Sequence, residues 1–139
     1  MNAKQLLRGT IVIWIVANIL DWLLHGLILK STYDSITGMV CSTGINPGWF
    51  VLGDLIMAFL FTWFYGRVQA GFEKSPKGAM MYGLILAIVV SIPGNMYLAI
   101  MVNGFPYWLS WAVTLATIIQ FSIYGYILGM LTKTKSTTA

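Results

Sequence analysis

Charged side chains are scarce in this chain of 139 residues. They make up 9% of the sequence, while apolar residues make up 58%. An average soluble domain carries roughly a quarter charged residues. So little charge cannot cover a water-soluble globule of this size. The composition therefore argues against an ordinary soluble domain and favours an integral membrane protein.

Cysteine and histidine occur once each, as Cys41 and His25. One cysteine cannot form an internal disulfide, and one histidine cannot build a two-histidine metal site or a bis-histidine haem site unless a partner chain contributes. The sequence also has no serine nucleophile elbow, H-E-x-x-H motif, phosphate-binding loop or dinucleotide fingerprint. We therefore expect a protein that is not an enzyme.

Four apolar stretches are each long enough for a membrane-spanning helix, which needs about 20 residues. We predict spans at residues 10–29, 48–65, 78–102 and 107–131. The first span follows basic residues but has no signal-peptide cleavage site, so we expect it to be retained. The predicted fold is all-α: one transmembrane domain over residues 1–139, folded as a left-handed up-down bundle of four helices.

The long connection between the first two spans covers residues 30–47. It is rich in Ser, Thr and Gly, and it also carries Tyr33, Ile36, Met39 and Val40. Two interpretations stay open: the segment folds back as a cap over the mouth of the bundle, or it is a plain solvated loop.

Basic residues are distributed unevenly between the two sides of this topology. Seven lie on the side that holds both termini, namely Lys4, Arg8, Arg67, Lys74, Lys77, Lys133 and Lys135. Only Lys30 lies on the other side, so the positive-inside rule places both termini in the cytoplasm. The charges form no single patch, and we expect no nucleic acid partner. The chain resembles small four-helix proteins of the bacterial inner membrane, and this resemblance implies the same location.

Small residues recur in the last two predicted spans. Ala79, Gly83 and Ala87 are each four apart, and Gly125 and Gly129 form a G-x-x-x-G pair. Lipid tails are as apolar as Leu, so helices in a membrane associate through small residues and polar links. We predict a close contact between these two spans. The alternative is that the two glycines face outward and contact another copy of the chain.

Three ionisable side chains, Asp21, His25 and Asp54, lie inside the predicted spans. Each costs about 2.5–3.5 kcal/mol at a helix centre on insertion scales, so such residues are frequently functional. Helical spacing puts Asp21 and His25 on one face, one turn apart. The two side chains can therefore form a direct ion pair or hydrogen bond.

Three other polar residues reach a similar depth, about 6–11 Å below the outer ends of their spans. They are Asn95, Trp111 and Thr114, while Asn18 shares the helix face of Asp21 and His25. If these faces converge, they form an outward-facing polar pocket together with the three ionisable residues. A plainer interpretation is that Asp21–His25 and Asp54–Asn95 are mutual hydrogen bonds that fix helix register. Gln120 lies deeper, toward the cytoplasmic half, and is thin evidence for a channel.

Two functions stay open on this sequence. The first is a non-enzymatic protein whose pocket binds a small ligand, a cation or a proton. The second is an accessory subunit of a larger respiratory or photosynthetic membrane complex, in which His25 ligates a pigment or haem in one axial position. Both place the chain in the lipid bilayer, and both are compatible with a homo-oligomer or a larger assembly.

Overall fold

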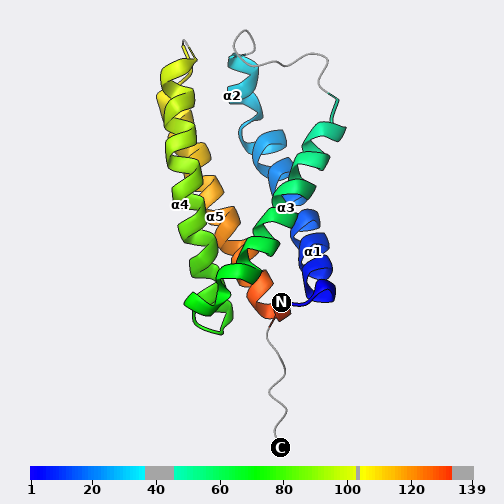
Figure 1. The fold of residues 1–139 in the computed structure, drawn as a ribbon. Helices are drawn as coiled ribbons and strands as arrows, with labels where there is room; N and C mark the ends of the chain where they lie inside the picture. The colour runs from blue at the N-terminus through cyan, green and yellow to red at the C-terminus, as the bar shows by residue number, and fades with distance from the viewer. Residues whose placement is uncertain (37–45, 103, 133–139) are drawn as a thin grey trace, which may run out of the picture.

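The computed structural model describes residues 1–36, 46–102 and 104–132, and every regular element in that part of the chain is helical (Figure 1). The elements are α1 (Ala3–Asp21), the π-helix η1 (Trp22–Ile28), α2 (Lys30–Ser35), α3 (Gly48–Val68), the 3-10 helix η2 (Gln69–Gly71), α4 (Pro76–Met101) and α5 (Tyr107–Thr132). Four helical stretches are long and apolar enough to span a membrane: Ala3–Ile28, Gly48–Gly71, Pro76–Met101 and Tyr107–Thr132. The prediction of four such helices is confirmed.

The first helix begins earlier than the apolar stretch that predicted it. It starts at Ala3 rather than at residue 10, because Asn2 and Gln5 form a capping box. In this motif each side chain accepts a hydrogen bond from the backbone N–H of the other residue, which satisfies donors that a helix start leaves unpaired. Lys4 and Arg8 therefore lie within the first helix and do not precede it.

The connection predicted at residues 30–47 begins with a short helix, α2. Ile36, just after α2, is buried and packs with Leu29 and with Leu109 of α5. The first part of this connection thus lies against the bundle, whereas Met39 and Val40, which were also considered for a cap, lie outside the described residues.

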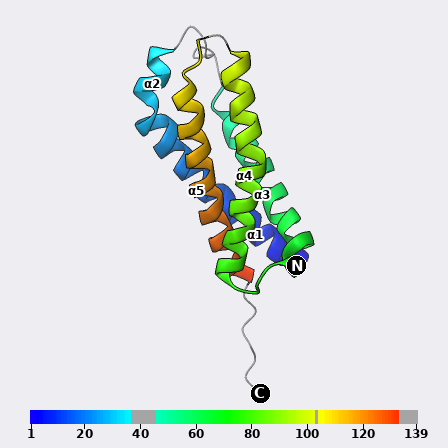
Figure 2. The same cartoon turned by 90° about the vertical axis from the view of Figure 1, so that its left-hand side faces the viewer.

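The helices pack as two pairs, α1 with α3 and α4 with α5, and α1 also contacts α5. The start of α1 and the end of α5 lie at one end of the molecule, here called the terminal end; α2 lies at the other, the loop end (Figures 1 and 2). The pairs lie close together at the terminal end, and α3 diverges from α4 and α5 toward the loop end (Figure 1).

The backbones of α4 and α5 are in direct contact. A Cβ atom at Gly83 would collide with the carbonyl oxygen of Phe121, and one at Gly125 would collide with the carbonyl oxygen of Ala79. Gly129 lies against Pro76 and Ala79 in the same contact, and Ala87 is fully buried. Both glycines of the G-x-x-x-G pair therefore face α4 and do not form an outward surface.

Candidate functional site

Polar side chains from three helices meet inside the bundle. Gln120 of α5 donates a hydrogen bond from Nε2 to Oδ1 of Asp21 of α1, at 2.7 Å. The carboxyl group of Asp54, on α3, lies near enough to that of Asp21 for the two charges to interact. All three side chains are partly buried. We call Asp21, Asp54 and Gln120 the carboxyl cluster.

Helical spacing carries each member of the cluster onto an interior face. Asp21 lies one turn after Ala17, which is fully buried, and Asp54 lies one turn before Ala58, which is also fully buried. Residues four apart share a helix face. The same faces that bury alanine therefore turn these two carboxyl groups toward the neighbouring helices.

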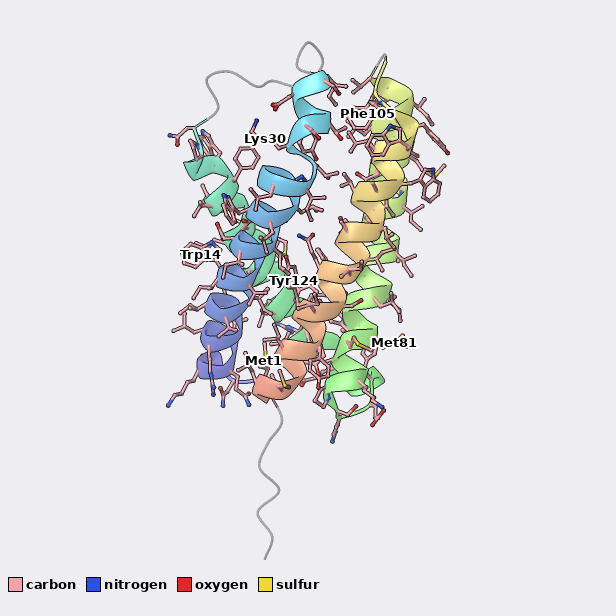
Figure 3. All side chains as sticks on the ribbon, turned by 180° about the vertical axis from the view of Figure 1, so that it is seen from behind. Met1, Trp14, Lys30, Met81, Phe105 and Tyr124 are labelled. Carbon is pink, nitrogen blue, oxygen red and sulfur yellow. The ribbon has the colours of Figure 1, made fainter. Side chains whose placement is uncertain are left out.

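Tyr124 lies one turn beyond Gln120 on α5, and Figure 3 shows it in the interior, in the half nearer the terminal end. Its side chain lies near both Asp21 and Asp54. The ring belongs to an aromatic group around Phe61, whose ring centroid is 5.0 Å from that of Tyr82, 5.4 Å from that of Phe121 and 6.1 Å from that of Tyr124. Aromatic rings thus fill the interior on the terminal side of the carboxyl cluster.

Among the described residues, the side chain that bonds His25 is that of Tyr33 and not that of Asp21. Nδ1 of His25 shares a hydrogen bond with the hydroxyl of Tyr33 at 2.8 Å, and the two rings stack. The cause is the π-helix η1, in which the N–H of Leu29 bonds the carbonyl of Leu24. A π-helix closes its turns over five residues, so positions four apart no longer align.

Tyr33 lies on α2, outside the spanning segments, and is half-buried. Burial raises the pKa of its phenol above the ordinary value, because the charged form is poorly solvated there. The phenol therefore keeps its proton at neutral pH and remains a donor or acceptor for His25.

Asn95 does not bond Asp54 but belongs to the α4–α5 pair. Its Nδ2 donates to Oγ1 of Thr114 at 2.9 Å. Asn18 donates to the carbonyl of Trp14 on its own helix. Trp111 is 46% exposed and packs edge-on against Tyr107.

The seven residues predicted for one pocket are thus divided among separate places. Asp21 and Asp54 meet in the carboxyl cluster. His25 pairs with Tyr33 near the loop end, and Asn95 pairs with Thr114 between α4 and α5. Asn18 bonds its own helix, and Trp111 faces outward.

Gln120 is the member of the cluster that the sequence reasoning missed. Counted from the outer ends of straight, parallel spans, Gln120 lies deeper than Asp21. One signal was available: it is the only glutamine in the predicted span 107–131. An amide in the hydrocarbon layer needs a partner inside the protein, and the carboxyl groups are the strongest acceptors within reach.

Two hollows lie away from the cluster. One, of about 500 Å³, lies at the terminal end and is lined by Tyr65, Gln69, Ala70, Lys74, Ser75, Gly129 and Thr132. The other is an apolar groove of about 490 Å³ between α3 and the α4–α5 pair. Neither is lined by Asp21, His25 or Asp54. Among the described residues, no three His, Cys, Asp or Glu side chains are grouped so that they could hold a metal ion.

Comparisons with protein-family models, with curated proteins and with solved structures found no match for this chain.

Proposed function

We propose that this chain is a non-enzymatic, multi-pass membrane protein whose Asp21–Asp54 pair holds an exchangeable proton. One observation carries the proposal: the carboxyl groups of Asp21 and Asp54, from different helices, lie near enough inside the apolar spans to interact electrostatically. Two neighbouring ionised carboxylates repel each other, whereas one shared proton removes the repulsion and joins the two groups through a hydrogen bond. The amide of Gln120, which donates a hydrogen bond to Asp21, then stabilises the negative charge that remains on the pair.

The direction of proton access follows from the surroundings of the pair. Asp21 lies seven residues before the end of η1 at Ile28, and Asp54 lies six residues after the start of α3 at Gly48. Each is therefore about 10 Å from the loop end of its helix. Aromatic rings fill the interior on the other side. We infer that protons exchange with the loop end and that the protein binds a proton without conducting it across the bilayer.

The loop end is the outer face in this proposal. Five of the basic residues in the described segments lie at the terminal end: Lys4, Arg8, Arg67, Lys74 and Lys77. Lys30 lies at the loop end. The positive-inside rule then supports both termini in the cytoplasm and the carboxyl pair near the outside, in the bacterial inner membrane that the resemblance to small four-helix proteins implies.

Infrared spectroscopy of the reconstituted protein tests the shared proton directly. The carbonyl stretch of a protonated carboxyl group should be present at acidic pH and vanish as the pH rises. Asp54→Asn and Asp21→Asn should each remove it, while Asp34→Asn should leave it, because Asp34 is an exposed partner of Lys30 outside the spans. A band that survives in both variants of the pair would refute the proposal. A band that sodium or potassium removes at constant pH would instead identify a cation site.

A second candidate function, an accessory subunit that holds a pigment or haem, is favoured by the bond between His25 and Tyr33. Metal-ligating histidines commonly use one ring nitrogen for the metal and the other for an orienting partner. Here Tyr33 engages Nδ1, which leaves Nε2 for a ligand. Gentle extraction followed by absorbance and mass spectrometry decides between the candidates, because only the second requires a coloured cofactor or partner subunits.

A further inference from the structure

The apolar groove runs along α3, where this helix diverges from the α4–α5 pair. It is lined by seven residues of α3 between Gly53 and Phe64, both included, by Leu86 and Val90 of α4 and by Phe121 of α5. No charged residue is among them. From Gly53 to Phe64 the groove follows a stretch of twelve residues of α3, about 16 Å of helix. A hollow of this length and chemistry, open to the side of the bundle, suits a hydrocarbon chain.

A single positive charge lies at the terminal end of this face. Arg67 is one turn beyond Trp63 and Phe64 on α3 and is exposed. Its guanidinium carbon lies 5.3 Å from the centroid of the Trp63 ring. A cation over an indole ring is attracted by the ring's quadrupole. Trp63, which lines the groove, thus holds the guanidinium at the point where the groove ends.

The wider charge at this end has the same sign. Lys74 and Lys77 follow on the connection to α4 and on its first turn, and Glu73 is the one acidic residue among the described residues there. Guanidinium groups match phosphate oxygens in a bidentate geometry. Basic sites beside membrane-spanning helices on the cytoplasmic side bind anionic lipid headgroups. The apolar groove therefore matches the acyl chain of a lipid, and the basic end matches its anionic headgroup.

We propose that the groove and Arg67 form a binding site for an anionic phospholipid. The acyl chain lies along α3 between Gly53 and Phe64, and the phosphate binds the guanidinium of Arg67. This site is separate from the carboxyl cluster, and the proposal does not depend on proton binding.

Native mass spectrometry of the full chain in detergent tests the site, with phosphatidylglycerol and phosphatidylcholine of identical acyl chains as probes. The wild type should retain phosphatidylglycerol more strongly. Arg67→Gln should lower that retention about tenfold, the loss expected for one hydrogen bond to a charged group. Arg8→Gln is the matched control, since Arg8 is also exposed at the terminal end but lies on α1, and it should behave as the wild type.

A groove-filling variant tests the acyl chain separately. Gly53→Trp should lower retention of both lipids, because a side chain there enters the groove but meets no atom within 4 Å at its Cβ. Ile15→Trp places the same side chain at an exposed position of α1, a helix that contributes no residue to the groove, and should have no effect.

Three results would overturn the proposal. The first is equal retention of the two lipids by the wild type, and the second is equal loss in Arg67→Gln and Arg8→Gln. The third is a dimer that Gly53→Trp dissociates, which would show that a second copy of the chain fills the groove.

Discussion

The two helix pairs are held together by different atoms. Between α4 and α5 the nearest atoms to Gly83 and Gly125 are backbone carbonyls of the facing helix. Between α1 and α3 the contact uses side chains: a Cβ at Gly9 would meet Cγ2 of Thr62 at 2.7 Å, and the indole N–H of Trp14 donates to the carbonyl of Val51 at 2.9 Å. Side chains can change rotamer, so the distance between α1 and α3 can adjust. A contact between two backbones fixes the distance between the axes of α4 and α5.

This difference separates a fixed part of the molecule from an adjustable part. Close approach of two helices in lipid gains dispersion energy that apolar side chains alone do not supply, because lipid competes for them. The α4–α5 pair therefore acts as a rigid support. The carboxyl cluster lies where α1 and α3 meet that support, on the side-chain contacts between helices and not on the backbone contact.

The largest effect is expected when the backbone contact is broken. Gly83→Ala places a methyl group against the carbonyl of Phe121, so α4 and α5 must move apart. Overpacking of this kind costs about 3 kcal/mol. The free energy of unfolding, measured by titration with sodium dodecyl sulfate in mixed micelles, should fall accordingly. Gly94→Ala on the same helix meets nothing within 4 Å and should not destabilise. Similar losses in both variants would contradict the backbone contact.

An intermediate effect is expected at the joint between the pairs. Gln120→Leu removes the amide that donates to Asp21 and should lower the free energy of unfolding by about 1–2 kcal/mol. Ser122→Ala serves as the control, because that hydroxyl bonds the carbonyl of Ile118 on its own helix. In an Asp21→Asn background the Gln120→Leu loss should shrink. An unchanged loss in that background would show that the two side chains are not coupled.

The smallest effect is expected from a single neutral hydrogen bond between the pairs. The hydroxyl of Tyr82 on α4 donates to the carbonyl of Phe61 on α3 at 2.8 Å. Tyr82→Phe keeps the ring and its aromatic contacts, so the same titration should show a loss of about 0.6 kcal/mol. Tyr97→Phe, at an exposed position of α4, provides the baseline. If Tyr82→Phe changes the free energy of unfolding no more than Tyr97→Phe does, the hydrogen bond does not stabilise the contact between the two pairs.

Hydrophobic length predicted the four helices, because a lipid core leaves few other structures for long apolar stretches. The starts and ends of helices were less predictable where polar residues continue a helix beyond the apolar run. Asn2 and Gln5 extend α1 through a local motif, and Gln69 to Gly71 extend the second span as a 3-10 turn.

The site was only partly predictable for a geometric reason. Composition singled out Asp21 and Asp54, because charged residues inside apolar spans are rare. Their partners depend on how the helices cross and on local changes of helical pitch. The spacing of residues along the sequence determines neither of these. Gln120 reaches Asp21 because the helices are not straight parallel rods, and His25 turns to Tyr33 because η1 is not an α-helix.

The π-helix has a consequence for how this chain can change through evolution. A π-turn is equivalent to one extra residue inserted into an α-helix, and it rotates the rest of the helix by about 100°. Leu29 and Ile36 reach Leu109 beyond that turn. A deletion of one residue between Trp22 and Ile28 would restore α-helical register and turn both side chains away from α5. The extra residue and the contact at the loop end must therefore be inherited together, and an insertion or deletion here is harder to tolerate than a substitution.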